Sequence, residues 1–397
     1  MNAIERGYRA RTPRSAEHFR RAQRLLPGGT TRTPAAYPPY PLTFVRGEGP
    51  YLWDADGHRY IDLLSNYSSL IHGNCFPPVI EAITQAAALG SAWAGGAQGT
   101  LDLAEELLGR LPRAEHVRLC NSGTEAALLA RRIATAVTGR HLLLRATGSY
   151  HGIEPIPTST GTDTLYAAYN DTEAFARVLT AHKNNIAAVY LEPVQSAGGV
   201  ITGDPAFLSN VAQLTRAAGA LFVLDEVVTL RLHAHGLQAP LELSPDLTLL
   251  GKIIGGGLPI GAIAGSRELL SVLDPAHPHH LHHAGTFNGN PLATAAGTIA
   301  LRHYQTAEIE RLDQLGARLE RGLRAAATAH GIPLTLRRAG SLLNVEPHSK
   351  LHLACLNHGV VIAPRGFMAL STAVSEKDIA EASERIHQAI GDLNGIQ

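Results

Sequence analysis

A single lysine interrupts an apolar run in the second half of the chain. The stretch LTLLGKIIGGG covers residues 247–257, in which three glycines closely follow Lys252. A lysine in apolar surroundings loses hydration, which lowers its pKa and frees the amine to attack a carbonyl group. The alternative is a lysine that extends its charged end to the surface along its own methylene chain. The residues that follow the other apolar runs help to decide between these two interpretations.

A polar turn and an aromatic residue follow two earlier apolar runs. HVRLC leads into Asn-Ser-Gly-Thr, where Ser122, Gly123 and Thr124 would present hydroxyl and backbone N–H groups at the start of a helix. Such a helix start suits a phosphate group, although an ordinary helix cap uses the same residue types. HLLLRATG leads into Tyr150, which could stack on a planar cofactor or pack beneath a loop.

Two acids, Asp225 and Glu226, follow the apolar run ALFVL. A carboxylate at the end of a buried strand needs a cation or a metal, and no histidine or further acid stands at ligand spacing to favour the metal. A carboxylate that faces a protonated ring nitrogen fits better. Together with the polar turn, Tyr150 and Lys252, it predicts a pyridoxal phosphate site. Lys252 would hold the aldehyde as a Schiff base, and the acid would keep the ring able to accept electrons from the substrate.

Strands that alternate with helices must position these residues. Helix-like segments separate several of the apolar runs, which is typical of a mostly parallel sheet in an α/β fold. Ligands of such sheets bind beyond the carboxyl ends of the strands, where the candidate residues stand. The predicted strands are HVRLC (116–120), HLLLRA (141–146), IAAVYLEP (186–193), ALFVLDEVV (220–228) and LTLLGKIIG (247–255).

The two ends of the chain differ from the middle. SAEHFRRAQRLL is expected to form a surface helix capped by Ser15, and proline-rich sequence follows it. A second helical region begins near residue 303, and the last helix is expected from Glu376. We therefore expect a large cofactor-binding domain over residues 46–302. A smaller α+β domain would combine residues 1–45 with residues 303–397.

The composition excludes several classes of protein. The 397 residues include 34 basic and 34 acidic side chains, so no net charge attracts a nucleic acid. No apolar run is long enough to span a membrane. The arginine-rich N-terminus contains acids and lacks the apolar core of a signal peptide, which favours a cytoplasmic protein. Three widely spaced cysteines suit a reducing compartment and are expected to be buried thiols.

The motifs, taken in order, resemble those of the class III aminotransferases, which are fold type I pyridoxal phosphate enzymes. The resemblance is greatest to β-amino-acid transaminases of the β-phenylalanine type and next to glutamate-1-semialdehyde aminomutases. It implies a mostly parallel central sheet flanked by helices, with a smaller domain. The motifs that carry it are LPGGTTR, GEGPYLWDADGHRYIDL, NSGTEA, SYHG, LEPVQSAGG, LDEVVTLRL, GKIIGGGLPIGAIAGS, HAGTFNGNPL and APRGF.

The resemblance also implies roles for individual residues. Asp225 would pair with the ring nitrogen and Lys252 would form the covalent link, so these two are the expected catalytic residues. Thr286 would reach the phosphate bound to the other subunit of a homodimer. The expected cofactor-binding residues are Ser122, Gly123, Thr124, Tyr150, Glu192, Asp225, Val227, Lys252 and Thr286.

Two arginines and a tyrosine are the expected substrate-binding residues. The resemblance places Arg32 at the substrate carboxylate and Arg365 at a second carboxylate position, and Tyr67 would line the pocket. An arginine suits this task because its planar guanidinium binds a carboxylate through two hydrogen bonds. The expected reaction moves the amino group of a β-amino acid to an oxo acid such as 2-oxoglutarate or pyruvate. For either arginine taken alone, a surface ion pair is the alternative.

Several other functions remain as alternatives. An aminomutase would use the same scaffold, but that family has a Ser-Gln-Phe-Glu pattern where this chain has Arg365. A transaminase of α- or ω-amino compounds and a catalytically silent pyridoxal phosphate protein are further possibilities. A nicotinamide dehydrogenase is disfavoured because no G-x-G-x-x-G motif follows the first strand. The five histidines within residues 277–283 are expected to form a polar loop and no metal site.

Overall fold

The computed structural model describes residues 1–152, 163–346 and 350–396. The chain forms two compact units. Unit 1 combines Met1–Phe76 with Glu310–Gln397, and unit 2 is Pro77–Ile309. Each unit is described by itself below.

The boundaries of the two units differ from those expected from the sequence. Residues 46–76 were expected in the large domain, but they belong to unit 1. The reason is strand pairing, because β3 (Arg59–Asp62) lies parallel to β15 (Val360–Val361) near the other end of the chain. The β1–β3 segment is therefore held by the C-terminal part of the chain.

Unit 2 is built on a mixed sheet, and among its described strands one runs against the others. The strand β12 is antiparallel to both of its neighbours, and the remaining strands share one direction. This confirms the α/β fold with a mostly parallel sheet. The order across the sheet is β4 (His116–Cys120), β12 (Gly261–Gly265), β11 (Leu247–Gly251), β10 (Leu221–Asp225), β7 (Ile186–Leu191), β5 (Leu142–Ala146) and β6 (Thr164–Ala167).

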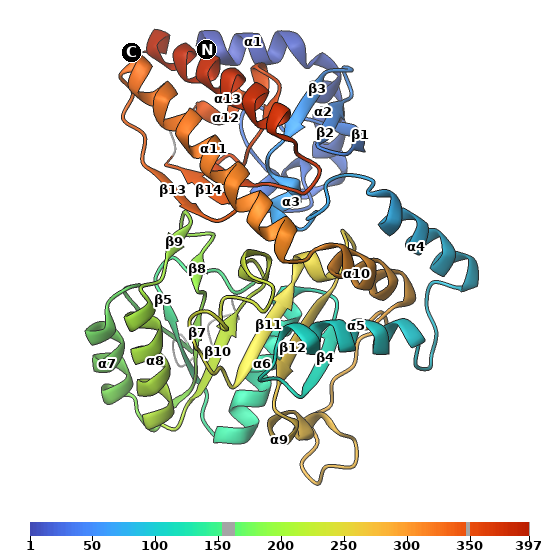
Figure 1. Cartoon of the computed structure of the whole chain (residues 1–397), viewed down its shortest axis with the longest axis vertical. Helices are drawn as coiled ribbons and strands as arrows, with labels where there is room; N and C mark the ends of the chain where they lie inside the picture. The colour runs from blue at the N-terminus through green and yellow to red at the C-terminus, as the bar shows by residue number, and fades with distance from the viewer. Residues whose placement is uncertain (153–162, 347–349, 397) are drawn as a thin grey trace. The chain divides into compact units, whose positions relative to one another are not determined.

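Helices cover both faces of this sheet. On one face α6 buries Leu129 and Ile133 in the same core as Tyr190 and Val223 of the sheet, whereas Leu128 of the same helix is 41% exposed. On the other face α7 and α8 pack over the side chains that alternate with these, and they lie side by side in Figure 1. The helices of unit 2 are α4 (Pro77–Leu89), α5 (Gln98–Arg110), α6 (Gly123–Thr138), α7 (Thr172–Ala181), α8 (Pro205–Ala217), α9 (Arg267–Leu270) and α10 (Pro291–His303).

Short elements complete unit 2. They are β8 (Val194–Gln195) and β9 (Ile201–Thr202), which pair with each other, and the 3₁₀ turns η3 (Thr229–Leu232), η4 (Lys252–Gly255) and η5 (Ser271–Leu273).

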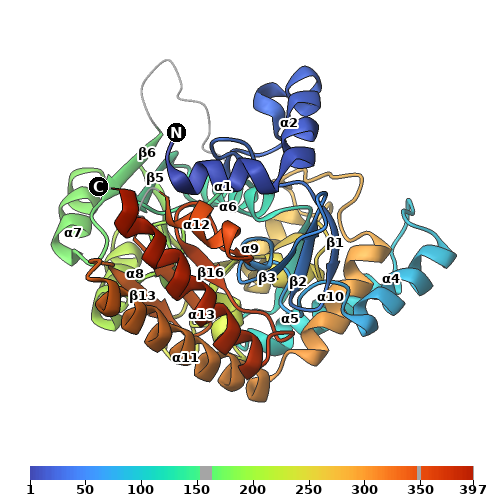
Figure 2. The ribbon, with the colours of Figure 1, turned by 90° about the horizontal axis from the view of Figure 1, so that it is seen from above.

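Unit 1 contains two small sheets and the helices of both chain ends. The long helix α11 and the last helix α13 lie side by side (Figures 1 and 2), and Arg318 of α11 forms an ion pair with Glu376 at 2.7 Å. The sheets have the orders β1-β2-β3-β15 and β13-β14-β16. The elements not yet given are α1 (Ala3–Arg11), α2 (Pro13–Leu25), η1 (Pro27–Gly29), η2 (Thr33–Ala35), β1 (Phe44–Glu48), β2 (Tyr51–Asp54), α3 (Ser65–Ser68), α11 (Thr306–His330), β13 (Leu336–Ala339), β14 (Leu342–Val345), α12 (Leu351–Asn357), β16 (Phe367–Ala369), α13 (Glu376–Gly391) and η6 (Asp392–Ile396).

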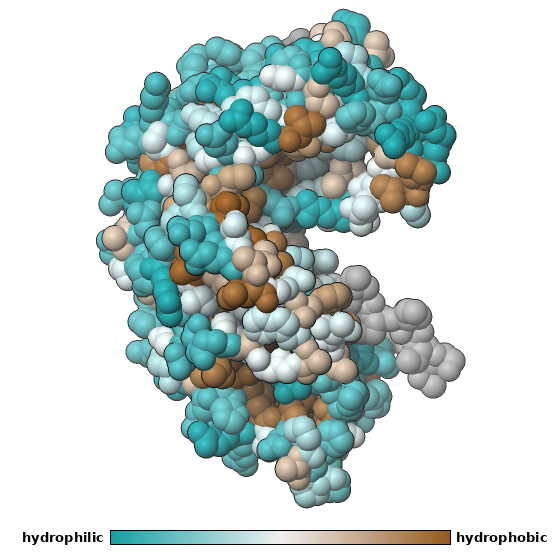
Figure 3. Space-filling model, turned by 90° about the vertical axis from the view of Figure 1, so that its right-hand side faces the viewer, coloured by the Kyte–Doolittle hydropathy of each residue, from teal (hydrophilic) through white to brown (hydrophobic). Residues whose placement is uncertain are grey.

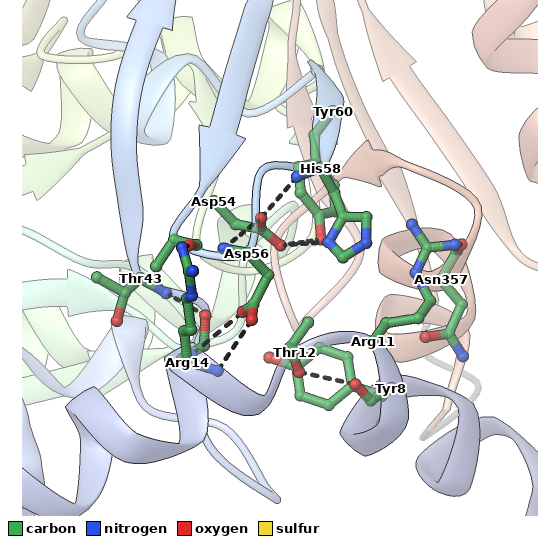
Figure 4. A network of polar contacts seen from close by, with 12 residues as sticks. Tyr8, Arg11, Thr12, Arg14, Thr43, Asp54, Asp56, His58, Tyr60 and Asn357 are labelled. Carbon is green, nitrogen blue, oxygen red and sulfur yellow. Dashed lines mark hydrogen bonds and ion pairs between the residues drawn. The ribbon is translucent and has the colours of Figure 1, made fainter.

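A polar network ties helix α2 to the β2–β3 hairpin (Figure 4). The carboxylate of Asp56 accepts hydrogen bonds from the backbone N–H groups of Arg14 (2.9 Å) and Ser15 (3.3 Å). Asp56 therefore satisfies the first turn of α2, which corrects the expected Ser15 cap. Buried Asp54 accepts from the hydroxyl of Tyr60 at 2.7 Å and from the ring of His58 at 3.1 Å, which fixes the hairpin.

The surface has the character expected for a folded chain with no net charge. Hydrophilic residues predominate on the face seen in Figure 3, and hydrophobic residues gather there in small groups. Cys120 and Cys355 are buried as expected, but Cys75 is exposed. Among the described residues, no helix combines the length and the apolar character that crossing a membrane requires.

A helix glycine controls how closely α10 approaches the turn that carries Lys252. A Cβ on Gly297 would lie 2.0 Å from the carbonyl oxygen of Ile254 in η4. We expect Gly297→Ala to lower the free energy of unfolding by about 1–3 kcal/mol, because the backbone must move to relieve the overlap. Gly109→Ala is the matched control, since its Cβ would meet no atom within 4 Å. This control should raise the stability by roughly 0.5–1 kcal/mol. Denaturant unfolding of both variants tests the prediction, and equal stabilities would contradict it.

Candidate active site

The candidate cofactor-binding residues follow strands that end at the same edge of the unit 2 sheet. The strands β4, β5, β7, β10 and β11 share one direction, so the loops after them emerge together. Ser122, Tyr150, Glu192 and Lys252 follow these strands, and Asp225 is the last residue of β10. Several of the loops touch one another.

The polar turn after β4 forms the N-terminus of α6. Ser122 is the N-cap of this helix, and its hydroxyl accepts a hydrogen bond from the N–H of Glu125 at 3.1 Å. Gly123 and Thr124 occupy the first two helical positions, where a backbone N–H has no partner within the helix. These N–H groups and the positive end of the helix dipole can bind a phosphate.

The loop after β5 lies directly against this turn. A Cβ on Gly152, which has a φ of +92°, would lie 2.6 Å from Oγ1 of Thr124. Tyr150 on the same loop is 58% exposed, so the face of its aromatic ring is open to a planar ligand. The hydroxyl of Ser149 is buried and has no hydrogen-bond partner in the described part of the chain. This loop contacts the start of α6, so the hydroxyl can donate to an anion bound there.

Glu192 connects the loops after β5 and β7. Its carboxylate accepts from the backbone N–H of Tyr150 at 3.0 Å and from that of Ser196 at 3.1 Å. Burial raises the pKa of Glu192, and repulsion from Asp225 acts in the same direction, while His151 and the two N–H groups oppose the rise. The structure therefore shows Glu192 holding the backbone of the Tyr150 loop.

Asp225 is held by two donors. Its Oδ2 lies 2.7 Å from Nδ1 of His151, and its Oδ1 accepts from the backbone N–H of Val227 at 2.9 Å. Both side chains of the Asp225–His151 pair are almost fully buried. These contacts fix the position of the carboxylate. The sequence analysis assigned no role to His151, although the SYHG motif contains it.

The neighbouring acid Glu226 points elsewhere. It accepts from the hydroxyl of Thr229 at 2.5 Å and from the backbone N–H of Gln238 at 2.8 Å, and burial raises its pKa. Asp225 and Glu226 therefore bind separate partners. No group of three or more potential metal ligands occurs among the described residues, and this includes the histidines at 277–283.

Val227 packs between the turn at the start of α6 and the end of β11, which precedes Lys252. Cβ atoms added to Gly123 and to Gly251 would lie within 3.2 Å and 3.3 Å of the methyl groups of Val227. Lys252, which follows Gly251 in the sequence, has a φ of +51°. This conformation is unfavourable for a residue with a Cβ, and such strain is typical of functional sites.

Thr286 lies in an exposed loop before α10. The loop is tied to the phosphate-binding region of its own chain, because the side-chain amide of Asn121 donates to Oδ1 of Asn288 at 2.7 Å. Two arginines also bind this loop through their guanidinium groups. Arg118 donates to Nδ1 of His283 at 3.2 Å, and Arg132 donates to the carbonyl oxygen of His282 at 2.7 Å. The histidine segment is thus anchored through ordinary hydrogen bonds.

All three candidate substrate-binding residues belong to unit 1, where Arg32 contacts Tyr67 and the guanidinium carbon of Arg365 lies 5.0 Å from the centre of the Phe367 ring. The guanidinium carbon of Arg32 lies 5.5 Å from the centre of the Tyr67 ring. Burial raises the pKa of Tyr67, whereas the positive charges of Arg365 and Arg32 lower it, so both cations act on the same phenol. Arg32 also donates from Nη2 to the side-chain oxygen of Asn66 at 2.7 Å.

Comparison with known proteins identifies the family. The model of the class III aminotransferases, described as "Aminotransferase class-III", matches residues 33–167 and 153–390. The chain belongs to this family. Class III aminotransferases use pyridoxal phosphate, and the phosphate-binding turn, the anchored carboxylate and the strained lysine of unit 2 fit that cofactor.

Two similar proteins are named for different activities. The β-phenylalanine transaminase of Variovorax paradoxus is 36% identical over 96% of this chain and 93% of its own length. A glutamate-1-semialdehyde 2,1-aminomutase of Chloroflexus aggregans is 34% identical over 96% of this chain and 99% of its own length.

Solved structures agree with the fold. An ω-transaminase from Sphaerobacter thermophilus has a TM-score of 0.91 and 34% identity, covering 96% of this chain and 98% of its own. A structure described as a transaminase with PLP bound has a TM-score of 0.92 and 31% identity, covering 96% of this chain and 97% of its own.

Proposed function

We propose that this enzyme is a β-amino-acid transaminase that moves the amino group of a β-phenylalanine-like donor to a 2-oxo acid such as 2-oxoglutarate or pyruvate. The observation that carries the proposal is the placement of two arginines against aromatic rings of unit 1, with Arg32 over Tyr67 at 5.5 Å and Arg365 over Phe367 at 5.0 Å. Two cations beside an aromatic side chain suit substrates that carry carboxylates together with a hydrophobic group.

The cofactor of the proposed reaction is pyridoxal phosphate, which supplies an aldehyde for amines and a ring that accepts electrons from the carbon next to the amino group. Ser122, Gly123 and Thr124 would hold its phosphate, and Tyr150 and Val227 would contact the two faces of its ring. Asp225 would accept a hydrogen bond from the ring nitrogen. The anchoring of Asp225 by two donors supports this role, because a fixed carboxylate needs no reorganisation during the reaction.

Lys252 has two tasks in this proposal. Its amine binds the aldehyde covalently until the substrate amine replaces it. The released amine then removes a proton from the substrate carbon and returns it at the cofactor end, so one side chain is both base and acid. Arg32 and Arg365 meanwhile bind the carboxylates of donor and acceptor.

The enzyme is further proposed to be a cytoplasmic homodimer in which Thr286 reaches the phosphate bound by the other subunit. The exposure of Thr286, together with the anchoring of its loop, supports this assignment. The arrangement would make each site dependent on two chains.

Two relatives favour other substrates, so an aminomutase and an ω-amine transaminase are the competing functions. Arg365 argues against the aminomutase, because an enzyme that moves an amino group within one molecule has no separate dicarboxylic acceptor to bind. Arg32 argues against an enzyme for simple amines, because such a substrate has no carboxylate.

The visible absorption spectrum of the purified protein tests the donor class. We expect the yellow form to lose its absorbance when β-phenylalanine is added without an oxo acid, and to regain it with 2-oxoglutarate or pyruvate. The control adds 1-phenylethylamine, which lacks the carboxylate. A protein that stays yellow with β-phenylalanine and bleaches with 1-phenylethylamine would assign the chain to simple amines. Bleaching only with glutamate 1-semialdehyde would assign it to the aminomutases.

A further inference from the structure

Residues Ser65–Ser68 form one left-handed turn, which is a rare conformation for residues other than glycine. The φ angles are +48° at Ser65, +47° at Asn66, +56° at Tyr67 and +71° at Ser68. Each of these residues carries a Cβ, which the left-handed conformation brings close to the backbone. Such strain persists only where the surroundings impose it, and it is common at ligand-binding sites.

Hydrogen bonds to two other residues of unit 1, Asp62 and Ala369, hold the turn in this conformation. Oδ1 of the buried residue Asp62 accepts from the backbone N–H groups of Leu64 and Ser65, both at 2.9 Å. The hydroxyl of Ser65 donates to the carbonyl oxygen of Ala369 at 2.9 Å. The start of the turn is thus fixed from both sides before it reaches Asn66.

The turn presents two successive side chains to the segment that carries Arg32. Asn66 accepts from the guanidinium through Oδ1, and the ring of Tyr67 lies beneath the same guanidinium. The hydroxyl of Tyr67 also donates to the carbonyl oxygen of Pro34. In an extended strand two consecutive side chains point to opposite faces, so the left-handed backbone explains how both reach one segment.

The partner of Arg32 is neutral. Asn66 supplies an uncharged amide oxygen to the guanidinium of Arg32. A guanidinium has five N–H donors in a planar fork, so one hydrogen bond to Asn66 orients it and leaves most donors available. Its positive charge also stays available, because the amide does not neutralise it.

We propose that Asn66 is a specificity-determining positioning residue, which orients Arg32 for the substrate carboxylate without neutralising it. This inference rests on the proposed function, in which Arg32 binds that carboxylate. The left-handed turn is the device that aims Asn66, and asparagine suits it because it tolerates positive φ better than most residues.

The test compares two substitutions that both tolerate positive φ. Asn66→Asp keeps the shape and places a carboxylate on Arg32, whereas Asn66→Gly keeps the backbone conformation and removes the acceptor. For β-phenylalanine we expect Asn66→Asp to raise KM about tenfold or more with little change in kcat. For 1-phenylethylamine, which lacks the carboxylate group and is expected to react slowly, kcat/KM should stay within about twofold of the low value of the unmutated holoenzyme. Asn66→Gly should give an intermediate rise in KM for β-phenylalanine only.

A matched control and a binding measurement separate this inference from the proposed function. Asn170 also has positive φ (+63°) and lies in unit 2, so Asn170→Asp reports the general effect of the exchange. Calorimetry with 3-phenylpropanoate measures carboxylate binding without turnover, and Asn66→Asp should weaken it about tenfold. Equal affinity of the two proteins, or no binding by the unmutated holoenzyme, would overturn the inference. Carboxylate binding that depends on Asn66 without turnover of β-phenylalanine would overturn only the proposed donor.

Discussion

Replacing Lys252 by alanine or arginine is expected to lower kcat by more than about 10⁴-fold. Proton transfer by a positioned side chain alone contributes roughly 10²–10⁴-fold, and these variants lose the covalent role as well. Arginine keeps the positive charge, but its guanidinium stays protonated and cannot attack an aldehyde. The amine of the lysine, and not its charge, is therefore the group under test.

Borohydride reduction followed by peptide mass analysis measures the covalent role directly. In the unmutated holoenzyme the added cofactor mass should be found on the peptide that contains Lys252, and it should be absent from both variants. Lys183→Arg is the control, because Lys183 is an exposed lysine of the same unit and should leave labelling and kcat unchanged. Cofactor mass on any other lysine would show that the assignment is wrong.

Asp225→Asn is expected to lower kcat by about 10³-fold, which is the scale of losing one preorganised electrostatic group. The substitution keeps the size of the side chain and removes its charge. The two donors that now hold the carboxylate, Nδ1 of His151 and the N–H of Val227, would face an amide that can accept through one atom only. The measurement is kcat at saturating pyridoxal phosphate, so that weaker cofactor binding does not hide the effect.

Glu226→Gln is the matched control, because it neutralises a second buried acid directly next in the chain. Glu226 accepts from Thr229 and Gln238, so its loss should reduce the free energy of unfolding by about 1–3 kcal/mol. The kcat of the folded protein should stay within about threefold. If both variants lost activity equally, the effect would come from disturbing this turn and not from the charge of Asp225.

Apolar runs and the residues after them were sufficient to predict much of the cofactor-binding unit. The strand β4 has the predicted bounds, and β5, β7, β10 and β11 lie within the predicted segments. Buried parallel strands read as continuous apolar segments, and the polar residues at their ends stand out for this reason. The same local pattern indicated a helix that begins within Ser122–Thr124, and the structure places its N-cap at Ser122.

The antiparallel strand β12 was missed because its sequence, GAIAG, has low strand propensity. Packing decides its conformation, since a Cβ on Gly261 would lie 2.1 Å from the carbonyl oxygen of Ser122. His151 was missed for a related reason. Its contact with Asp225 joins residues that are distant in the sequence, and a local pattern cannot show such a contact. The proximity of Arg32, Tyr67 and Arg365 likewise depends on the fold of both chain ends.

The split composition of unit 1 has a consequence for synthesis of the protein. Domains usually fold in the order in which the ribosome makes them, but unit 1 cannot do so. Its strand β3 cannot pair until β15 has been made, and the left-handed turn lacks its hydrogen bond to Ala369 until that residue has been made. All of unit 2 is synthesised in between. Unit 2 is therefore complete and able to fold while unit 1 still lacks β15, and the segment of unit 1 that precedes unit 2 is completed only by residues made after it.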